Sequence, residues 1–231
     1  MNTYSMMEIG NMKYYVTAVV ATAALFFGAA ANAGFGDLKK LGNNVADDSS
    51  NVSQEAIAQN FASALATVIQ GQAELHDALN NKEKAAELRA TAEALTGGST
   101  VEQGDLEKAR AVSADAQVSA QEKIDAGAEL SAEGREHYVN GLVLSAQGVS
   151  ETKAMAKEAS DFATSAQQQI SSASMMKKAS VTKKLAAGMY VAKELPGFTT
   201  ELVENLNLLV TFAKSVDLPI PEDATNMLAA L

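Results

Sequence analysis

The fold is decided by residues 131–173, which carry the most regular hydrophobic pattern in the chain. They read SAEGREHYVNGLVLSAQGVSETKAMAKEASDFATSAQQQISSA. Small or apolar residues recur here at alternating steps of four and three, the heptad pattern of helices that pack lengthwise against each other. The positions of this stripe are Tyr138, Leu142, Ser145, Val149, Thr152, Ala156, Ala159, Ala163, Ala166, Ile170 and Ala173. We therefore expect one long helix with a single packing face.

Four glycines recur every seven residues beside this stripe: Gly127, Gly134, Gly141 and Gly148. Glycine inside a helix costs about 1 kcal/mol relative to alanine, so its repetition at one heptad position needs a physical reason. Two interpretations are open. The glycines form a groove that another helix, from this chain or from a partner, approaches closely, or they only relieve crowding inside the chain's own bundle.

Upstream, a first helix is expected to begin near Ser53, whose hydroxyl can cap its first turn. It is expected to continue through residues 82–95 and to end at Gly97 and Gly98, because glycine suits a helix C-terminus. Its apolar residues follow steps of three and four, which places them on one face. They are Ile57, Phe61, Leu65, Val68, Gln72, Leu75 and Leu79.

A second helix is expected from Val101 to about Leu130, after a capping-box pattern formed by Ser99 and Glu102. We expect the chain to break between about residues 127 and 134, where Ser131 can cap the long helix that follows. One continuous helix through this region is the alternative.

After the long helix, the frame of the apolar pattern slips and the pattern continues to Leu195. Pro196 and Gly197 are expected to end that element, and another helix is expected to begin at Thr199. From Asn51 to Leu195 the chain contains no proline and is rich in good helix formers. The sequence therefore predicts an all-α fold, an elongated antiparallel bundle of about four long, alanine-rich amphipathic helices plus a short C-terminal helix.

The beginning of the chain has the pattern of a cleaved secretory signal peptide. Lys13 precedes an apolar run, and the run closes on Ala31-Asn32-Ala33. An uncleaved anchor is the alternative, although the run is shorter than the ~20 residues that a membrane span needs. We expect a signal peptide over residues 1–33, a flexible leader over 34–52 and a single helical-bundle domain over 53–231. No further apolar run of spanning length follows, so a periplasmic or secreted protein is expected.

The charge balance disfavours some partners. Acidic residues outnumber basic ones by 28 to 18, which gives a formal net charge of −10. Nucleic-acid binding, which needs a basic surface, is therefore not expected, and the net charge also disfavours docking on anionic lipid. A local exception is the basic cluster of Lys177, Lys178, Lys183 and Lys184. It is either an anion-facing patch or a solvated face that pairs with acidic residues of neighbouring helices.

Residues suited to catalysis are few. The chain has no cysteine, hence no disulfide and no thiolate chemistry, and its two histidines are His76 and His137. Neither histidine follows a glutamate by three residues, as a di-iron helical bundle requires. A looser site made of Glu133, Glu136 and His137 is conceivable, but no catalytic residue, cofactor or metal site is expected.

We therefore expect an exported, non-enzymatic interaction protein that presents long helical faces to a protein partner or to a second copy of itself. The alternative is a reversible binder of lipid or other apolar ligands, in which amphipathic helices open around the ligand. An enzyme is the least favoured class.

Overall fold

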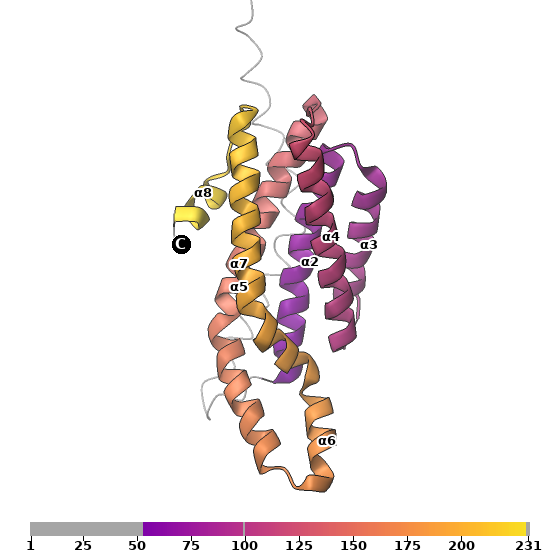
Figure 1. The fold of residues 1–231 in the computed structure, drawn as a ribbon, viewed down its shortest axis with the longest axis vertical. Coiled ribbons are helices and arrows are strands. Elements are labelled where there is room, and N and C mark those ends of the chain that lie inside the picture. Colours follow the sequence, from indigo (N-terminus) through magenta and orange to yellow (C-terminus); the bar gives the residue numbers. More distant parts are fainter. Residues whose placement is uncertain (1–52, 99, 230–231) are drawn as a thin grey trace, which may run out of the picture. The chain divides into compact units, whose positions relative to one another are not determined.

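The structure, a computed structural model, describes residues 53–98 and 100–229, and within them the chain forms seven α-helices and no strand (Figure 1). The helices are α2 (Gln54–Ala78), α3 (Lys82–Thr96), α4 (Gln103–Asp125), α5 (Ala132–Ser172), α6 (Met175–Lys184), α7 (Ala186–Ser215) and α8 (Glu222–Ala229). The predicted all-α fold with antiparallel helix packing is confirmed for this part of the chain. The predicted signal peptide (1–33) and leader (34–52) lie outside the described residues.

Helix α2 is the central helix, because α3, α4, α5 and α7 all pack against it. Every position of the stripe predicted from Ile57 to Leu79 is buried. A further set of buried residues, which includes Ala58, Ala62 and Ala73, lies outside that stripe. The helix is thus enclosed on more than one side, and the sequence pattern underestimated its burial.

Helices α2 and α5 run antiparallel and approach each other closely. Gly134, near the start of α5, lies beside Ala78 at the end of α2, whereas Gly148 lies beside Val68, further back along α2. A Cβ atom built on Gly134 would come within 2.8 Å of the Ala78 carbonyl oxygen. Such a distance is shorter than real Cβ contacts, so only glycine fits there without displacement of the backbone.

The same contact continues at Gly141, the middle glycine of the repeat. A Cβ atom on Gly141 would lie 2.8 Å from Cγ of Leu75 and 3.0 Å from the carbonyl oxygen of Gly71. Gly71 is the glycine that α2 itself contributes, and a Cβ there would lie 3.2 Å from the backbone nitrogen of Ser145. The groove along α5 is therefore filled by α2 of the same chain.

Gly127 does not belong to this groove. It adopts a φ of +80°, and nothing lies within 4 Å of a Cβ built on it. The amide of Ala128 donates to the carbonyl of Lys123, the hydrogen bond that closes α4 over a left-handed residue. Gly127 shares the heptad spacing but ends a helix, which also confirms the predicted break before α5. As expected, Ser131 caps α5 and accepts a hydrogen bond from the amide of Gly134.

The first predicted helix is in fact two helices, α2 and α3, that form an antiparallel hairpin. Asn80 adopts a φ of +55°, and the amide of Asn81 donates to the carbonyl of His76. These features are those of a helix end built on a left-handed residue, a conformation that asparagine tolerates better than most residues do. The prediction of one helix through residues 82–95 was wrong. The chain has no glycine or proline near residue 80, and asparagine takes the role at the helix end that these residues usually have.

The helix start predicted at Ser99 and Val101 was also wrong. Glu102 is the N-cap of α4, and its side chain forms a capping box with Asp105. Glu102 thus takes the place in the box that was assigned to Ser99, which lies outside the described residues.

Pro196 lies inside α7, where the sequence predicted the end of a helix. Proline removes one backbone hydrogen bond and costs about 3 kcal/mol in a helix interior. The prolyl ring is on the exposed side, while Leu195 and Phe198 on either side are buried. Because the same face of α7 stays in the core before and after the proline, burial compensates for the lost hydrogen bond.

Helix α7 lies antiparallel to α5. The hydroxyl of Tyr138 donates to the carbonyl of Leu209 over 3.0 Å, and the Arg135 guanidinium donates to the carbonyls of Val216 and Asp217 at the end of α7. Helix α8 packs against both α5 and α7.

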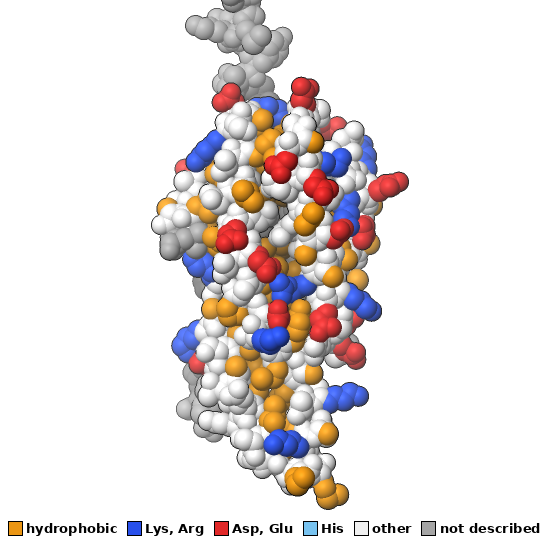
Figure 2. Space-filling view, viewed as in Figure 1, with side chains coloured by type: hydrophobic (Ala, Val, Ile, Leu, Met, Phe, Trp, Pro, Cys, Tyr) orange, Lys and Arg blue, Asp and Glu red, His pale blue; other side chains and the backbone are white. Residues whose placement is uncertain are grey.

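Among the described residues, α5 and α6 form one end of the bundle. The C-terminal part of α5 and all of α6 project beyond α2, α3 and α4 (Figure 1). The chain reverses at Ala173 and Ser174, where the heptad frame slips, and α6 has no buried residue. On the face drawn in Figure 2, this lowest end shows apolar and lysine side chains and no acidic one.

The glycine contact generates the first prediction. Gly141→Ala should destabilise the protein by about 1–3 kcal/mol, because the added methyl overpacks the α2–α5 contact. Gly197→Ala is the matched control, since Gly197 lies inside α7 with nothing within 4 Å of the position that a Cβ would take. It should stabilise by up to ~1 kcal/mol through helix propensity. Urea unfolding followed by circular dichroism measures both, and equal stabilisation by the two substitutions would contradict the close contact.

Candidate functional site

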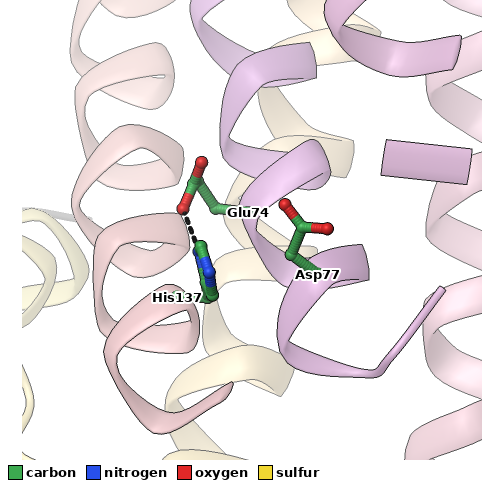
Figure 3. A group of neighbouring side chains, drawn as sticks. All are labelled: Glu74, Asp77 and His137. Carbon is green, nitrogen blue, oxygen red and sulfur yellow. Dashed lines mark hydrogen bonds and ion pairs between the residues drawn. The ribbon is translucent and has the colours of Figure 1, made fainter. Parts of the chain in front are cut away.

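Four charged or titratable side chains from three helices meet on one side of the hairpin. Glu74 and Asp77 come from α2, Arg89 from α3 and His137 from α5 (Figure 3 shows the first two with His137). Arg89 lies 2.8 Å from a carboxylate oxygen of Glu74 and 2.6 Å from one of Asp77. Nδ1 of His137 lies 2.7 Å from the other Glu74 oxygen. These residues form an ion-pair network that ties α3 and α5 to the central helix.

The network contains the kinds of ligand atom that bind metal ions, but its positive charge is already supplied by the side chain of Arg89. Ligand atoms of Glu74, Asp77 and His137 all lie within 4.8 Å of one another. The Arg89 guanidinium, however, already bridges the two carboxylates. Burial acts to lower the pKa of Arg89, but its hydrogen bonds to Asp77 and Glu74 outweigh this and raise the pKa. A metal ion would have to displace a guanidinium that matches both carboxylates, so these residues fit a structural ion pair better than a metal centre.

From the sequence, a looser site was conceivable that joined His137 to Glu133 and Glu136, its neighbours on the same helix. The structure leaves both glutamates exposed and pairs His137 with Glu74 of α2 instead. No sequence signal pointed to that pair, because the two residues are 63 positions apart and meet only through the α2–α5 contact.

The side chain of His76, a residue of α2, is fully buried against α4. Its Nε2 lies 3.0 Å from the carbonyl oxygen of Ala116, and its Nδ1 lies 3.2 Å from the side-chain nitrogen of Asn81. A carbonyl oxygen only accepts, so Nε2 carries the proton and Nδ1 accepts from the amide. Both ring nitrogens are thus satisfied by a neutral imidazole. Burial lowers the pKa of His76, although the hydrogen bond to Ala116 opposes this effect.

The space beside His76 is too small for a substrate. Gln72 lies next to it and donates to the carbonyl of Ser113 over 3.1 Å. The cavity lined by these two side chains of α2 and by α4 and α7 has a volume of about 10 Å³, enough for roughly one water molecule. The buried polar residues Gln72 and His76 therefore join α2 to α4.

A larger, open groove lies between α4, α5, α6 and α7, with a volume of about 790 Å³. Its apolar lining includes Ala163 and Ile170 of α5 and Met189 of α7. Tyr190, Glu107 and Lys193 place polar groups around it. The groove is open to solvent, and its dimensions allow a small apolar ligand.

The four lysines of the predicted anion-facing patch all lie on α6 and are exposed. Among the residues that the structure describes, none of Lys177, Lys178, Lys183 and Lys184 forms an ion pair with an acidic side chain. The structure thus brings the patch together on one short helix, and the pairing with neighbouring acidic residues considered above does not occur there.

No protein-family model, no curated protein and no solved structure matches this chain. Among the described residues, no helix is both long enough and apolar enough to cross a membrane.

Burial of His76 generates a second prediction. Since the folded state holds the pKa of His76 below the ordinary value of about 6.5, the unfolded state binds a proton first as the pH falls. Above about pH 6.5, His76 is neutral in both states and does not affect the free energy of unfolding. Below that pH, protonation of His76 in the unfolded state lowers the free energy of unfolding, by up to about 1.4 kcal/mol per pH unit from this one group. Lys84 of α3 and Lys123 of α4 act in the same direction, and Asp115 of α4 opposes them.

His76→Gln serves as the matched variant, because the amide can donate to Ala116 but does not titrate. Urea unfolding at a series of pH values between 7 and 5 should show a steeper loss of stability for the original protein than for the variant. Parallel curves would contradict a lowered pKa of His76.

Proposed function

We propose that this protein is exported and acts without catalysis, by presenting a helical surface to a partner in the periplasm or outside the cell. Export is supported by the signal-peptide pattern that ends at Ala33. A non-enzymatic role is supported by the use of the polar residues: Arg89 neutralises Glu74 and Asp77, and His76 is sealed in the core.

The observation that carries the proposal is α6. This helix has ten residues, none of them buried, and the proline-free chain that leads to it continues past the end of the central helix. Isolated helices shorter than ~12–15 residues are marginally stable in water, and most helical stability in proteins comes from packing of one face. An exposed helix that the described part of its own chain does not cover is a surface suited to a partner.

The groove between α5 and α7 supports a second candidate function, the reversible binding of an apolar ligand. Its lining by Ala163, Ile170 and Met189 is the observation in its favour. In that case the ligand would protect groove residues of α4, α5 and α7 as well as Thr182 of α6, whereas a partner on α6 would protect residues 175–184 and leave the groove residues of the other helices unchanged.

Hydrogen exchange read by mass spectrometry separates the two. In the purified exported protein, amides of α6 should exchange much faster than those of α2, because α6 makes few tertiary contacts. Addition of the cell-envelope fraction of the producing cells should slow exchange in residues 175–184 at least tenfold, with α2 as the internal control. Protection confined to the groove would favour the ligand binder, and no protection in either region would contradict both candidates.

A further inference from the structure

The turn between α5 and α6 places two apolar side chains in full contact with solvent. Met175 is 94% exposed and Met176 is 96% exposed, the highest values among the large apolar residues that the structure describes. Both lie in the first turn of α6, at the end where the α5–α6 hairpin projects from the bundle (Figure 1). We call this end, residues 170–184, the tip.

Positive charge is concentrated around the same end. From residue 162 to residue 193 the chain contains five lysines and no aspartate or glutamate, although the whole chain has a net charge of −10. The acidic residues that flank this segment in sequence are Asp161 and Glu194, and both are engaged, with Lys157 and with Arg110. The tip is therefore a cationic and apolar end on an acidic protein, as the lowest part of Figure 2 shows.

Two of the four lysines of α6 lie where the helix macrodipole disfavours a positive charge. Lys177 and Lys178 follow directly on the exposed methionines near the N-terminus of α6, and its first turn contains no acidic residue. The helix macrodipole is positive at that end, so a cation there is unfavourable and a negative partner is favoured. Within the described part of the chain, no acidic side chain pairs with Lys177 or Lys178 to offset this cost.

We propose that the tip docks on a membrane surface that contains anionic phospholipid. Met175 and Met176 enter the interface between headgroups and acyl chains, while Lys177, Lys178, Lys183 and Lys184 lie against the lipid phosphates. This inference rests on the proposed function, in which α6 is the interaction surface, and names the partner of that surface.

Membrane lipid fits the tip better than an acidic protein does. Protein interfaces are depleted in lysine and concentrate affinity in aromatic and arginine side chains, which α6 does not contain. Lysine is a mobile point charge on a flexible stem, suited to a diffuse layer of phosphates. The exposed side chains of Met175 and Met176 project from the bundle, so a rigid protein surface would need a matching pocket to bury them. A fluid bilayer interface can enclose them without one.

The overall acidity of the chain does not oppose this docking. Charges are screened over a Debye length of about 8 Å at physiological ionic strength. A bilayer in contact with the tip therefore senses the lysines of α6 much more than the acidic side chains along the rest of the bundle. The expectation from net charge, that anionic lipid is disfavoured, applies to the average surface and not to this end.

The absence of tryptophan from the chain allows a direct test, because a single introduced tryptophan is the only one present. Met176→Trp reports on the tip, and Val118→Trp, at a residue of α4 that is 59% exposed, is the matched control. On vesicles of equal parts phosphatidylglycerol and phosphatidylcholine, emission of the tip variant should shift to shorter wavelength, and that of the control should not. Equal behaviour of the two variants would overturn the proposal.

Charge substitutions test the lysines without a change in the apolar residues. Lys177→Gln with Lys178→Gln should weaken co-sedimentation of the full exported chain with the same vesicles by roughly 30-fold at low salt. Lys108→Gln with Lys214→Gln, which removes two exposed lysines of α4 and α7, should leave binding within about twofold. Binding should also fall as salt is raised, and vesicles of phosphatidylcholine alone should not bind.

Equal losses in the two lysine pairs would overturn the proposal, since they would reflect net charge alone. Protection of α6 by the envelope fraction without any binding to anionic vesicles would also overturn it, and would leave a protein as the partner in the proposed function. If the protein bound no anionic vesicles and the envelope fraction also failed to protect α6 from hydrogen exchange, the proposed function itself would be contradicted.

Discussion

The close antiparallel contact between α2 and α5 is the constraint on which the rest of the structure depends. Gly134, Gly141 and Gly148 remove side chains from α5 where α2 lies against it, and Gly71 does the same on α2. Each of the glycines inside α5 is unfavourable for the helix by itself. The compensation is that α2 comes close enough to α5 to be enclosed by four helices, so that its apolar and alanine-rich faces are all buried.

Enclosure of α2 in turn brings together residues that are far apart in the sequence. His137 reaches Glu74, and Arg89 reaches both Glu74 and Asp77, only because α5 and α3 flank the same turn of α2. The side chain of His76, on the other side of α2, is buried against α4. The polar residues that include the donor set of a metal site therefore link the helices of the bundle, and the surfaces proposed for interaction lie elsewhere.

The length of α5 explains where those surfaces are. This helix has 41 residues and α2 has 25, and Phe162 of α5 lies close to Gln54 at the beginning of α2, since both lie beside Gly188. Beyond Phe162 the central helix has ended, and Ala166 is the last residue of α5 that is buried. The continuation of α5 and its return as α6 consequently project without a core, and this projecting hairpin carries the methionines and lysines of the tip.

Periodic features of the sequence predicted the parts of the fold that depend on local chemistry. The stripe from Ile57 to Leu79, the cap at Ser131 and the break before it were all recognisable, because each follows from residues within one or two turns. Features that depend on tertiary packing were not recognisable. Pro196 is tolerated because the buried face of α7 continues past it, and the glycine spacing included Gly127, whose backbone conformation differs from that of the other three.

The candidate site shows the same division. The basic cluster of α6 was visible in the sequence, whereas the absence of an acidic partner for it among the described residues depends on the projection of α5 past α2. The turn at Asn80 was missed because asparagine, a residue compatible with many conformations, takes the left-handed role that glycine usually fills. Without that turn, α3 could not have been placed beside α2, and the network around Arg89 could not have been inferred.

The most direct test of the account is a disulfide across the α2–α5 contact. The chain contains no cysteine, so Gly71→Cys with Leu144→Cys introduces the only two thiols, and a Cβ built on Gly71 lies 3.1 Å from Cβ of Leu144. A disulfide prefers a Cβ–Cβ distance of about 3.8 Å, within reach of a small relaxation. Mild oxidation, followed by non-reducing electrophoresis and mass spectrometry, should give an intramolecular disulfide whose yield does not depend on protein concentration. Disulfide-linked dimers, or free thiols in folded protein, would contradict the contact within one chain.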